Sequence, residues 1–384
     1  MSCDLKWIIL DNILFGFNEE SKNYMNSSNI NKIILFDLDN TIIKTKSGKV
    51  FPINKNDWTF IIKQVPQIIY SHIKSGAICG IISNQKGLRN SLLINNWIDK
   101  INDINKQLKL HFVFVSLKDD NFRKPLPSSW DYIKNNFIAN INYDKLLKDK
   151  KIYYIGDAFG RISDFSDTDY KYSVNCKFKF KTPELFFKFN LDDPNIINGS
   201  ITYPIIDYYS KNKQIKLFQT IFNIIESSQK IFIMLIGFPA SGKSFLRKEI
   251  IKKYPDFKYI NNDDSVDNFD NPNLITSNKN INQYNKIISD NTNLNIKNRL
   301  KILTDFDSHL KIAIWFDYTQ EQTSHLNYMR MFWFGSKLIS PLIYRTLNKN
   351  FTKPEDVAEG FDKLFIISKV FNNFDFSNKI QYYF

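Results

Sequence analysis

Two carboxylates stand two residues apart at the end of a short apolar run. The run covers residues 33–36, and Asp37 and Asp39 follow it in the pattern Asp-x-Asp-x-Thr. Such a run predicts a buried parallel strand, and ligands of open α/β sheets bind beyond the carboxyl ends of these strands. One carboxylate can attack or bind a metal ion while the other handles a proton. Residues 44–52 are turn-rich and predict a hairpin or flap over this turn. An ordinary acidic turn has the same pattern, so the neighbouring strands have to decide between the two interpretations.

Polar side chains also follow the next two apolar runs of the first half. Ser83 and Asn84 come after residues 78–82, and a hydroxyl and an amide at a strand end can hydrogen-bond phosphate oxygens. Lys124 comes shortly after residues 112–115, where a lysine can balance the charge of two aspartates and a phosphate. Each group taken alone also fits a plain polar loop or a solvated basic pair.

An acidic cluster follows the fourth predicted strand. Asp157 comes just after residues 152–155 and can complete a set of oxygen ligands for Mg²⁺. Asp164, Asp167 and Asp169 lie beyond it and are further candidates on the metal side, although carboxylates in such positions more often cap helices or lie on the surface. Four strands are thus predicted to deliver an acid pair, a hydroxyl, a lysine and an acid to one edge of a parallel sheet.

The second stretch with an evident chemistry is a phosphate-binding loop. It has the pattern G-x-x-x-x-G-K-[ST] and consists of Gly237, Phe238, Pro239, Ala240, Ser241, Gly242, Lys243 and Ser244. An apolar run at 231–236 precedes it and a predicted helix at 245–253 follows, which is the context that the motif requires. The backbone N–H groups of such a loop bind phosphate, Lys243 would reach the β- and γ-phosphates of ATP, and Ser244 would ligate Mg²⁺.

Three residues of the second half are candidates for phosphoryl transfer. Asp263 follows a predicted strand at 257–260 and can accept a proton from an attacking hydroxyl, although a helix cap would use the same residue. Asp290 ends another predicted strand and can lie near the metal ion. Arg330, on a predicted helix, can close over the transferring phosphoryl group, although a single arginine more often lies on the surface.

The length of the chain suits two domains. It has 384 residues, of which 43% are hydrophobic and 24% charged, as in a soluble globular protein long enough for real cores. We expect two doubly wound parallel-sheet domains, the first at residues 1–190 and the second at 229–384. Residues 191–228 hold prolines and many Asn, Asp and Ser before a predicted helix at 216–227, and we assign them to the connection.

Charge and cysteine content restrict the partners and the compartment. The formal net charge of +13 favours a polyanion such as nucleic acid, although lysine bias in the gene would give the same number. Three scattered cysteines cannot form a disulfide framework and favour a reducing, intracellular compartment. No signal peptide and no membrane-spanning run is expected.

The order of acid pair, hydroxyl, lysine and acid resembles the haloacid dehalogenase superfamily of phosphotransferases. Such a half followed by a P-loop half resembles the bifunctional polynucleotide kinase 3′-phosphatase family, from about residue 32 to residue 365. In the first half the matching motifs are Ser47–Pro52, Asp57-Trp58, Ser83-Asn84-Gln85, Arg123-Lys124-Pro125 with Trp130, Gly156-Asp157-Ala158-x-Gly160-Arg161, Asp164-Phe165-Ser166 and Thr182-Pro183-Glu184-x-Phe186-Phe187. In the second half they are Gly237-Phe238-Pro239, Asp290-Asn291-Thr292-Asn293 and Ala358-Glu359-Gly360-Phe361. The resemblance implies a haloacid dehalogenase-like (Rossmannoid) domain followed by a P-loop kinase domain.

For the first half the resemblance implies a polynucleotide 3′-phosphatase. Asp37 would attack the 3′-phosphate to give an aspartyl-phosphate, and Asp39 would protonate the leaving 3′-oxygen and then activate water. Asp37, Asp157 and the backbone carbonyl of Asp39 would hold Mg²⁺. Ser83 and Lys124 would bind the phosphate.

For the second half it implies an ATP-dependent polynucleotide 5′-hydroxyl kinase. ATP would bind at residues 237–244, Asp263 would deprotonate the 5′-hydroxyl, and Arg330 would be the lid arginine. The joint products are a 5′-phosphate and a 3′-hydroxyl, the ends that a ligase needs, so we expect a ligase to act downstream. Broken DNA ends are the favoured substrate, and a monomer is expected. A nuclear or other repair compartment fits this role, although no clear targeting signal is present.

The chain departs from this family at several positions. The family's forkhead-associated domain has no room before Asn31, so recruitment through it is not expected. The family's Asn-Arg-Asp around the kinase base reads Asn261-Asn262-Asp263 here with Asp264 adjacent, which leaves the base open, although the spacing favours the first aspartate. Tyr328 stands where the family tends to have a second lid arginine, which leaves the strength of the kinase open.

Two other functions remain open on the sequence alone. The same chemistry would serve RNA ends, and turnover on DNA and RNA ends measured side by side would distinguish the two. A degenerate pair of domains would instead bind broken ends without processing them. The intact acid pair and the P-loop lysine argue against that binder.

Overall fold

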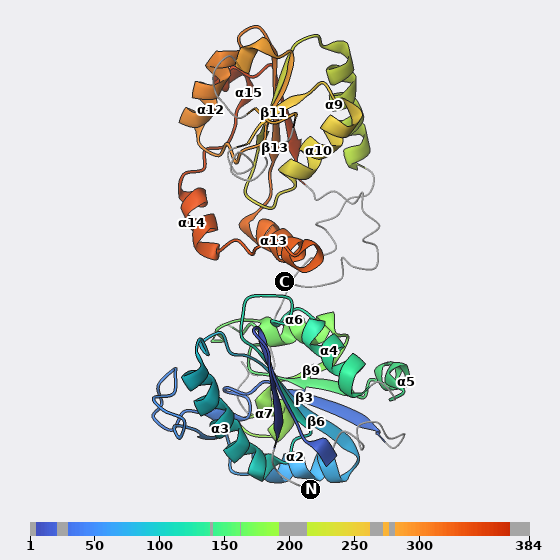
Figure 1. Ribbon diagram of the computed structural model, residues 1–384, viewed down its shortest axis with the longest axis vertical. Coiled ribbons are helices and arrows are strands. Elements are labelled where there is room, and N and C mark those ends of the chain that lie inside the picture. Colours follow the sequence, from blue (N-terminus) through green and yellow to red (C-terminus); the bar gives the residue numbers. More distant parts are fainter. Residues whose placement is uncertain are drawn as a thin grey trace. The chain divides into compact units, whose positions relative to one another are not determined.

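The computed structural model describes residues 5–20, 30–138, 141–161, 163–191, 213–261, 272–275 and 281–368. The described chain forms two compact units, the first up to residue 191 and the second from residue 213 (Figure 1). Each unit is built on its own sheet, and the expected α/β class is confirmed for both. The predicted kinase base Asp263 and its neighbour Asp264 lie outside the described residues.

A seven-stranded sheet in the order β1-β2-β7-β6-β3-β8-β9 forms the centre of the first unit. Its strands are β1 (Lys6–Ile9), β2 (Ile13–Phe17), β3 (Lys32–Phe36), β6 (Ala77–Asn84), β7 (Phe112–Ser116), β8 (Ile152–Ile155) and β9 (Lys179–Lys181). The strands from β7 to β9 in this order run parallel, as predicted for the four that end in polar groups. The sheet is nevertheless mixed, because β1 and β2 form an antiparallel hairpin on the β7 edge. All of β2 is buried, so its unbroken apolar run lacks the alternation that would have identified a strand.

Helices cover both faces of this sheet. One face carries α2 (Val65–Lys74), α3 (Ser91–Leu108) and α7 (Pro183–Phe187), and the other carries α4 (Ser128–Phe137), α5 (Tyr143–Lys148) and α6 (Thr168–Asn175). Helix α3 shows the pattern that drives this packing, because Trp97, Ile101 and Ile104 lie at helical spacing and are all buried.

The apolar residues of the range 58–74 recur at helical spacing, yet the helix covers only part of this range. A two-stranded ribbon of β4 (Ile43–Lys44) and β5 (Thr59–Phe60) takes up its start, and α2 begins only at Val65. Pro66 lies in the first turn of α2, where the missing N–H of a proline leaves no intrahelical bond unmade. The proline therefore marks the start of this helix, which the apolar spacing alone did not.

The second unit has a five-stranded parallel sheet in the order β11-β12-β10-β13-β14. Its strands are β10 (Ile231–Ile236), β11 (Lys258–Ile260), β12 (Lys286–Ser289), β13 (Leu310–Phe316) and β14 (Lys363–Ile367). Its helices are α9 (Lys213–Ser227), α10 (Lys243–Lys253), α12 (Ile296–Leu303), α13 (Gln320–Phe334), α14 (Pro341–Lys349) and α15 (Asp356–Glu359), with short 3₁₀ turns η2 (Ile281–Gln283) and η3 (Thr304–Phe306). Helix α9, which the sequence placed in the connection, buries Ile221 and Ile225 in the core of this unit.

Candidate active sites

The turn after β3 carries Asp37 and Asp39. The backbone N–H of Asp37 donates to the carbonyl of Ile155 at 2.8 Å, which extends the β3–β8 pairing by one residue. The chain then turns, because the N–H of Ile42 returns to the carbonyl of Leu38 at 2.9 Å. Strand β3 thus places Asp37 at the carboxyl edge of the sheet and Asp39 in the tight turn beyond it.

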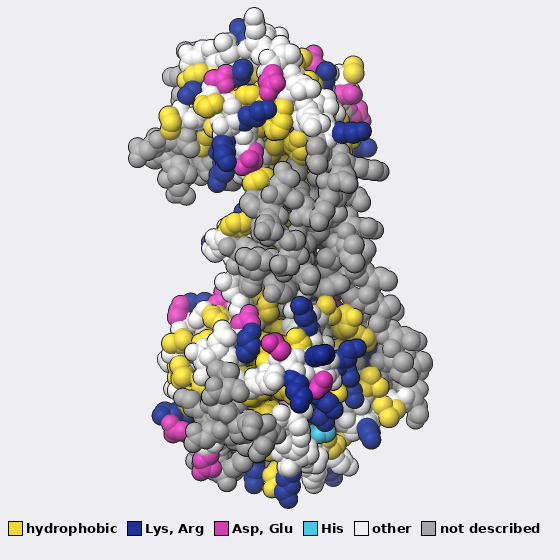
Figure 2. Space-filling view, turned by 90° about the vertical axis from the view of Figure 1, so that its right-hand side faces the viewer, with side chains coloured by type: hydrophobic (Ala, Val, Ile, Leu, Met, Phe, Trp, Pro, Cys, Tyr) yellow, Lys and Arg dark blue, Asp and Glu magenta, His cyan; other side chains and the backbone are white. Residues whose placement is uncertain are grey.

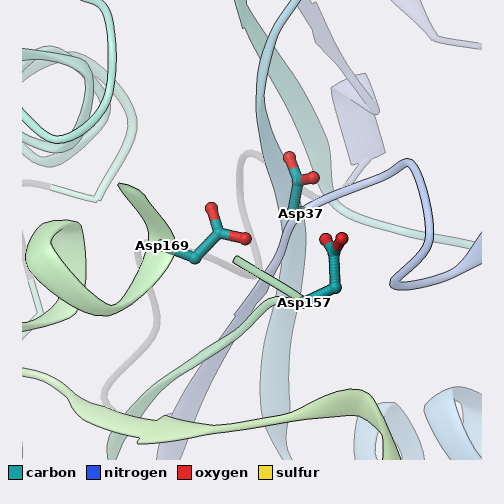
Figure 3. Close-up of side chains that lie close together, drawn as sticks. All are labelled: Asp37, Asp157 and Asp169. Carbon is teal, nitrogen blue, oxygen red and sulfur yellow. The ribbon is translucent and has the colours of Figure 1, made fainter. Parts of the chain in front are cut away.

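Three carboxylates converge at this edge. Asp37 after β3, Asp157 after β8 and Asp169 on α6 each offer an oxygen within 4.8 Å of the other two (Figure 3). A set of carboxylate oxygens of this kind suits a hard cation such as Mg²⁺. Two predicted metal ligands are therefore brought together. Asp169, expected at a helix cap or on the surface, is instead buried and is the third member of the set.

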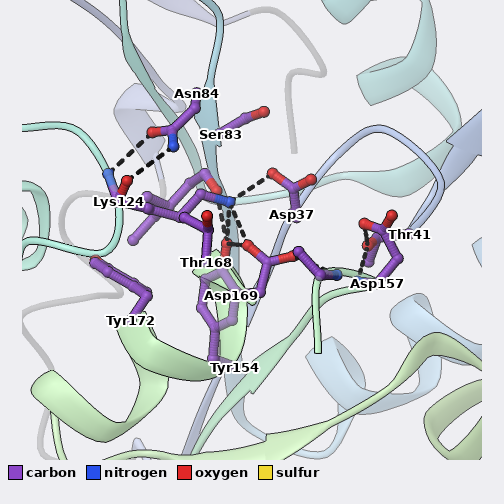
Figure 4. Close-up of polar contacts among 12 residues, drawn as sticks. Asp37, Thr41, Ser83, Asn84, Lys124, Tyr154, Asp157, Thr168, Asp169 and Tyr172 are labelled. Carbon is purple, nitrogen blue, oxygen red and sulfur yellow. Dashed lines mark hydrogen bonds and ion pairs between the residues drawn. The ribbon is translucent and has the colours of Figure 1, made fainter. Parts of the chain in front are cut away.

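Lys124 balances part of this negative charge. Its Nζ donates to Oδ1 of Asp37, to Oδ1 of Asp169 and to the hydroxyl of Tyr154, each at 2.7 Å (Figure 4). An ammonium group has three protons, so these contacts use all of its donors. Burial alone would lower the pKa of Lys124, but the carboxylates of Asp169 and Asp37 raise it, so the lysine stays charged.

A glycine allows Asp169 to come this close to the strand end. The Oδ2 of Asp169 accepts a hydrogen bond from the backbone N–H of Ala158 at 3.2 Å. A Cβ on Gly156 would lie only 2.3 Å from the same oxygen, so no other residue fits at this position without movement. Burial raises the pKa of Asp169, and the charge of Lys124 opposes that rise.

The end of β6 contributes a hydroxyl and two amides. Ser83 is buried, and its hydroxyl accepts from Nε2 of Gln85 at 3.1 Å. The same Nε2 donates to Oδ2 of Asp39 at 2.7 Å, so Gln85 links the two strand ends. The amide of Asn84 donates to the backbone carbonyl of Lys124 at 3.1 Å and accepts from its N–H at 3.0 Å (Figure 4). Asn84 therefore fixes the loop from which the lysine reaches the site.

The pKa values of Asp39, Asp157 and Asp169 are shifted upward. Burial, followed by the charges of Asp169 and Asp37, raises the pKa of Asp157 to about 8. The side chain of Asp39 is open to solvent on one side, yet desolvation by the surrounding protein still raises its pKa. The charge of Lys100 on α3 opposes that shift, and the charge of Asp37 adds to it. A carboxyl group with a raised pKa can donate a proton closer to neutral pH.

The hairpin of β4 and β5 encloses a loop at residues 45–58, which contains most of the segment predicted to form a hairpin or flap, and we call this loop the flap. The carboxylate of Asp57 orders it by accepting from the N–H and hydroxyl of Ser47 at 2.8 and 2.7 Å and from the N–H of Ile53 at 3.0 Å. Val50 and Phe51 point outward and are 88% and 80% exposed. The flap therefore presents an apolar tip on an ordered base.

The P-loop of the second unit joins β10 to α10. Gly242 has a φ of 96°, which favours glycine, and α10 begins at the next residue. The Nζ of Lys243 donates to the carbonyls of Gly237 at 2.9 Å and Phe238 at 2.8 Å, so it lies across the loop. The hydroxyl of Ser241 is buried and has no hydrogen-bond partner among the described residues. A helix N-terminus, a lysine and an unsatisfied hydroxyl form a site suited to phosphate.

Asp290 follows β12 near this loop. Its Oδ2 pairs with Nε of Arg247 at 2.9 Å, and the guanidinium carbon of Arg247 lies 3.8 Å from the ring centre of Tyr259. Burial raises the pKa of Asp290, and the charges of Arg247 and Lys243 oppose the rise. The carboxylate is thus within electrostatic reach of the P-loop lysine.

Arg330, the predicted lid arginine, lies on α13. Its Nη2 donates to the carbonyl of Lys337 at 3.1 Å, and the described residues show no hydrogen bond or ion pair between it and the P-loop. Tyr344 on α14 does contact that loop, because its hydroxyl donates to the carbonyl of Pro239 at 3.1 Å. Burial raises the pKa of Tyr344 to about 12, and the charge of Arg330 opposes the rise.

A hollow of about 860 Å³ opens beside the end of β12 and α12. Its polar lining consists of side-chain amides and hydroxyls with one lysine and one aspartate. These polar residues are Ser289, Asn291, Thr292, Asn293, Asn295, Asn298, Lys301, Asp305 and Asn350. Such a lining offers many uncharged donors and acceptors next to Asp290.

Sequence reasoning missed two buried residues of the first site. Tyr154 sits in the middle of an apolar strand, where a tyrosine gives no sign of a polar role. Lys100 is buried on α3, and its charge acts on Asp39. A readable signal existed for Lys100, because it interrupts the apolar face that carries Trp97 and Ile101.

Comparison with known proteins gives a consistent result for both halves. Residues 32–187 match the family described as polynucleotide kinase 3 phosphatase. The chain is 28% identical over 365 residues to a bifunctional polynucleotide phosphatase/kinase of Schizosaccharomyces pombe, covering 93% of this chain and 83% of that protein. It is 26% identical over 381 residues to a protein of Acanthamoeba polyphaga mimivirus that is provisionally named a bifunctional polynucleotide phosphatase/kinase, covering 89% of this chain and 85% of that protein.

A third relative corresponds to the first half alone. A polynucleotide 3′-phosphatase of Saccharomyces cerevisiae is 28% identical over 206 residues, covering 40% of this chain and 87% of that protein. Among the described residues, no helix combines the length and apolar character needed to cross a bilayer.

Proposed function

The chain belongs to the bifunctional polynucleotide phosphatase/kinase family, and we propose that it heals broken DNA ends by removing 3′-phosphates and phosphorylating 5′-hydroxyls with ATP. The observation that carries the proposal is the convergence of Asp37, Asp157 and Asp169 at one sheet edge, where Lys124 bonds to Asp37 and Asp169. A P-loop on the same chain supports the second activity. In this assignment residues 1–190 form the phosphatase domain and 229–384 the kinase domain, and α9 of the expected connection at 191–228 packs with the kinase domain.

In the phosphatase reaction Asp37 attacks the phosphorus atom and the bond to the 3′-oxygen breaks. Asp39 gives its proton to that oxygen, and an aspartyl-phosphate remains on Asp37. Asp39 then takes a proton from the water that hydrolyses this intermediate, which releases inorganic phosphate and restores both carboxyl groups. The raised pKa of Asp39 supports this role, and the hydrogen bond from Gln85 holds its carboxyl group in place while opposing that rise. Ser83 holds a phosphate oxygen, Lys124 holds another by exchanging one of its three present contacts for it, and Asn84 acts by holding the Lys124 backbone.

Mg²⁺ fits the acidic set of the first unit. Asp37, Asp157 and the backbone carbonyl of Asp39 would hold the ion, and Asp169 adds a carboxylate beside it. When bound, the ion supplies positive charge that lets a carboxylate approach a phosphate dianion. Lys124 contributes further positive charge, because it bonds to both Asp37 and Asp169.

In the kinase reaction residues 237–244 bind the triphosphate of ATP. Lys243 leaves the carbonyls of its own loop to contact the β- and γ-phosphates, and Ser244 would hold Mg²⁺. Asp263 takes the proton of the 5′-hydroxyl as that oxygen attacks the γ-phosphate, and ADP leaves. Arg330 stabilises the charge on the transferring group. The amide-lined hollow beside Asp290 offers room for the acceptor strand.

A labelled DNA nick with a 3′-phosphate and a 5′-hydroxyl tests both halves at once. With Mg²⁺ and ATP both ends should change, and an added ligase should then seal the nick. With ATP withheld, only the 3′-phosphate should be released. Retained binding with no release of inorganic phosphate would contradict the proposal, and faster turnover on RNA ends would move the natural substrate to RNA.

A further inference from the structure

Strand β9 forms an exposed, lysine-bearing edge of the first unit. Among the described strands it pairs only with β8. Lys179 and Lys181 are both exposed and stand two residues apart, about 7 Å along the strand. Their Nζ atoms lie 5.5 and 5.8 Å from the ring centre of Tyr153 on β8, so one aromatic ring supports both ammonium groups.

Two more lysines adjoin this edge. Lys150 and Lys177 are exposed and follow α5 and α6, in left-handed conformations with φ of 54° and 61°. A hollow of about 240 Å³ brings them together with Lys179. The apolar residues lining this hollow are Leu147, Ile152 and Phe178. We call Lys150, Lys177, Lys179 and Lys181 the β9 lysine surface.

The charge of this surface is not balanced within the described chain. None of its four lysines forms an ion pair with a described residue, whereas many other lysines of this unit do. The positive potential reaches α2, where burial lowers the pKa of His72 and the charges of Lys32 and Lys181 lower it further. Lys and Arg side chains gather on the visible face of this unit in the space-filling view (Figure 2).

The surface starts next to the candidate phosphatase site. Lys181 pairs with Ile155, and the N–H of Gly156 donates to the carbonyl of Lys181 at 3.3 Å. Asp157 is the next residue of the chain, so Lys181 lies at the level of the carboxylates. Lys179 and Lys177 then continue away from that edge.

We propose that the β9 lysine surface binds the phosphodiester backbone of the strand whose 3′-phosphate enters the first site. This inference rests on the proposed function. Lysine contacts to backbone phosphates give affinity without sequence preference, which suits an enzyme that must accept any sequence at a break. Lysines on an edge strand can alternatively serve only to prevent association between sheet edges. The two explanations predict different salt dependence of binding.

The test compares two variants of the full chain. K150Q/K177Q/K179Q/K181Q removes the surface, and K6Q/K55Q/K106Q/K118Q removes the same formal charge from lysines that already pair with acids. Binding of a 3′-phosphorylated oligonucleotide is measured over a salt series without Mg²⁺. Hydrolysis of a 3′-phosphorylated dinucleotide, which is too short to follow the surface, is measured with Mg²⁺.

We expect the surface variant to bind the oligonucleotide with a salt slope lower by about 3, which is about 0.7 for each lost phosphate contact. The control variant should keep the wild-type slope, and both should hydrolyse the dinucleotide normally. If the fourfold variant does not fold, K179Q/K181Q should lower the slope by about 1.4.

An unchanged slope with intact dinucleotide hydrolysis would overturn the inference. If that variant self-associates, the lysines serve to prevent association between sheet edges. If the wild type binds an acidic protein more tightly than the oligonucleotide, the lysines serve a protein partner. Loss of dinucleotide hydrolysis in a folded surface variant would also overturn it. A wild-type protein that cannot hydrolyse the dinucleotide would instead contradict the proposed function.

Discussion

Tyr154 and Lys124 are joined by a 2.7 Å hydrogen bond in which the ammonium group donates to the phenol oxygen. The phenol proton is used elsewhere, because the same hydroxyl donates to the carbonyl of Ile82 at 2.9 Å. With its only proton engaged, the hydroxyl presents a lone pair to Lys124. The fully buried tyrosine on β8 therefore holds the ammonium group of Lys124 in position at the carboxyl edge of the sheet.

Tyr154→Phe should lower the phosphatase kcat about tenfold while the protein stays folded. The ring still fills its place in the core, but Lys124 loses one of three partners and the carbonyl of Ile82 loses its donor. An unsatisfied buried polar group costs about 1–3 kcal/mol, and about 1.4 kcal/mol in a barrier is tenfold in rate. Steady-state kinetics and thermal unfolding would measure the two effects separately.

Tyr172→Phe is a matched control for this variant. Tyr172 is also fully buried, but its hydroxyl bonds to Ser129 rather than to the site. The Tyr172→Phe variant should be less stable than the wild type, but the folded variant should keep the wild-type phosphatase kcat. Equal loss of kcat in the two variants would show that Tyr154 matters for packing alone.

Asp37→Asn should abolish the phosphatase and leave the kinase at its wild-type rate. An amide cannot form the acyl-phosphate, and the change lies in the first unit only. Lys243→Ala should have the reverse effect, because it removes the charge that meets the β- and γ-phosphates. Release of inorganic phosphate and transfer of labelled phosphate from ATP would be measured on the same preparations. Loss of both activities in either folded variant would refute two separate sites.

Motif spacing predicted the first site because the carboxyl ends of parallel strands meet at one edge. Asp37, Asp157 and Lys124 were expected to converge there, and the contacts of Lys124 with Asp37 are as expected. Asp169 was misplaced because its position depends on the close approach of Gly156, a three-dimensional relationship that no local pattern reveals.

The sequence also did not reveal the roles of polar residues that are buried inside apolar strands and helices. Tyr154 has the strand environment of any core aromatic residue, and its hydroxyl gains a role only through Lys124, thirty positions away. The hairpin β1–β2 was missed for a related reason. Gly16 and its apolar neighbours form a continuous buried run, which carries no period that separates strand from helix.

Asp157 should make Mg²⁺ binding depend on pH. Its pKa rises from 3.8 to about 8 because of burial and the charges of Asp169 and Asp37. The folded protein thus holds this proton more tightly than the unfolded chain. Without Mg²⁺, the protonated Asp157 therefore adds to the free energy of unfolding. This contribution is fully present below about pH 4 and is lost as the pH rises to about 8. Mg²⁺ needs the deprotonated carboxylate, so its apparent affinity should rise over the same range.

Thermal unfolding with and without Mg²⁺ at about pH 6 and about pH 8 would measure this linkage. The stabilisation by Mg²⁺ should be larger at the higher pH. Asp157→Asn should remove most of that stabilisation and should raise the stability of the metal-free protein at the higher pH. A stabilisation by Mg²⁺ that is equal at both pH values would contradict the assignment of Asp157 to the metal ion.

Glu359→Gln should destabilise the second unit selectively. Glu359 and Arg299 form a fully buried, bidentate ion pair, with Nε–Oε2 and Nη2–Oε1 distances of 2.6 Å. Removing one partner of a buried pair typically costs about 3–5 kcal/mol, because the other charge stays buried. Arg299 also donates to the carbonyl of Asn293, whose side chain bonds to the carbonyl of Leu235 on β10. The loss should therefore reach the strand that leads into the P-loop.

Kinase activity should consequently disappear at a lower temperature than in the wild type, while phosphatase activity keeps its wild-type temperature dependence. Both activities would be assayed after heating the same samples. Glu226→Gln is the control, because Glu226 pairs with Lys253 on the surface of the same unit and its loss should change little. If Glu359→Gln lowered the two activities in parallel, the two units would not unfold independently, and the ion pair would be stabilising the whole chain rather than the nucleotide site.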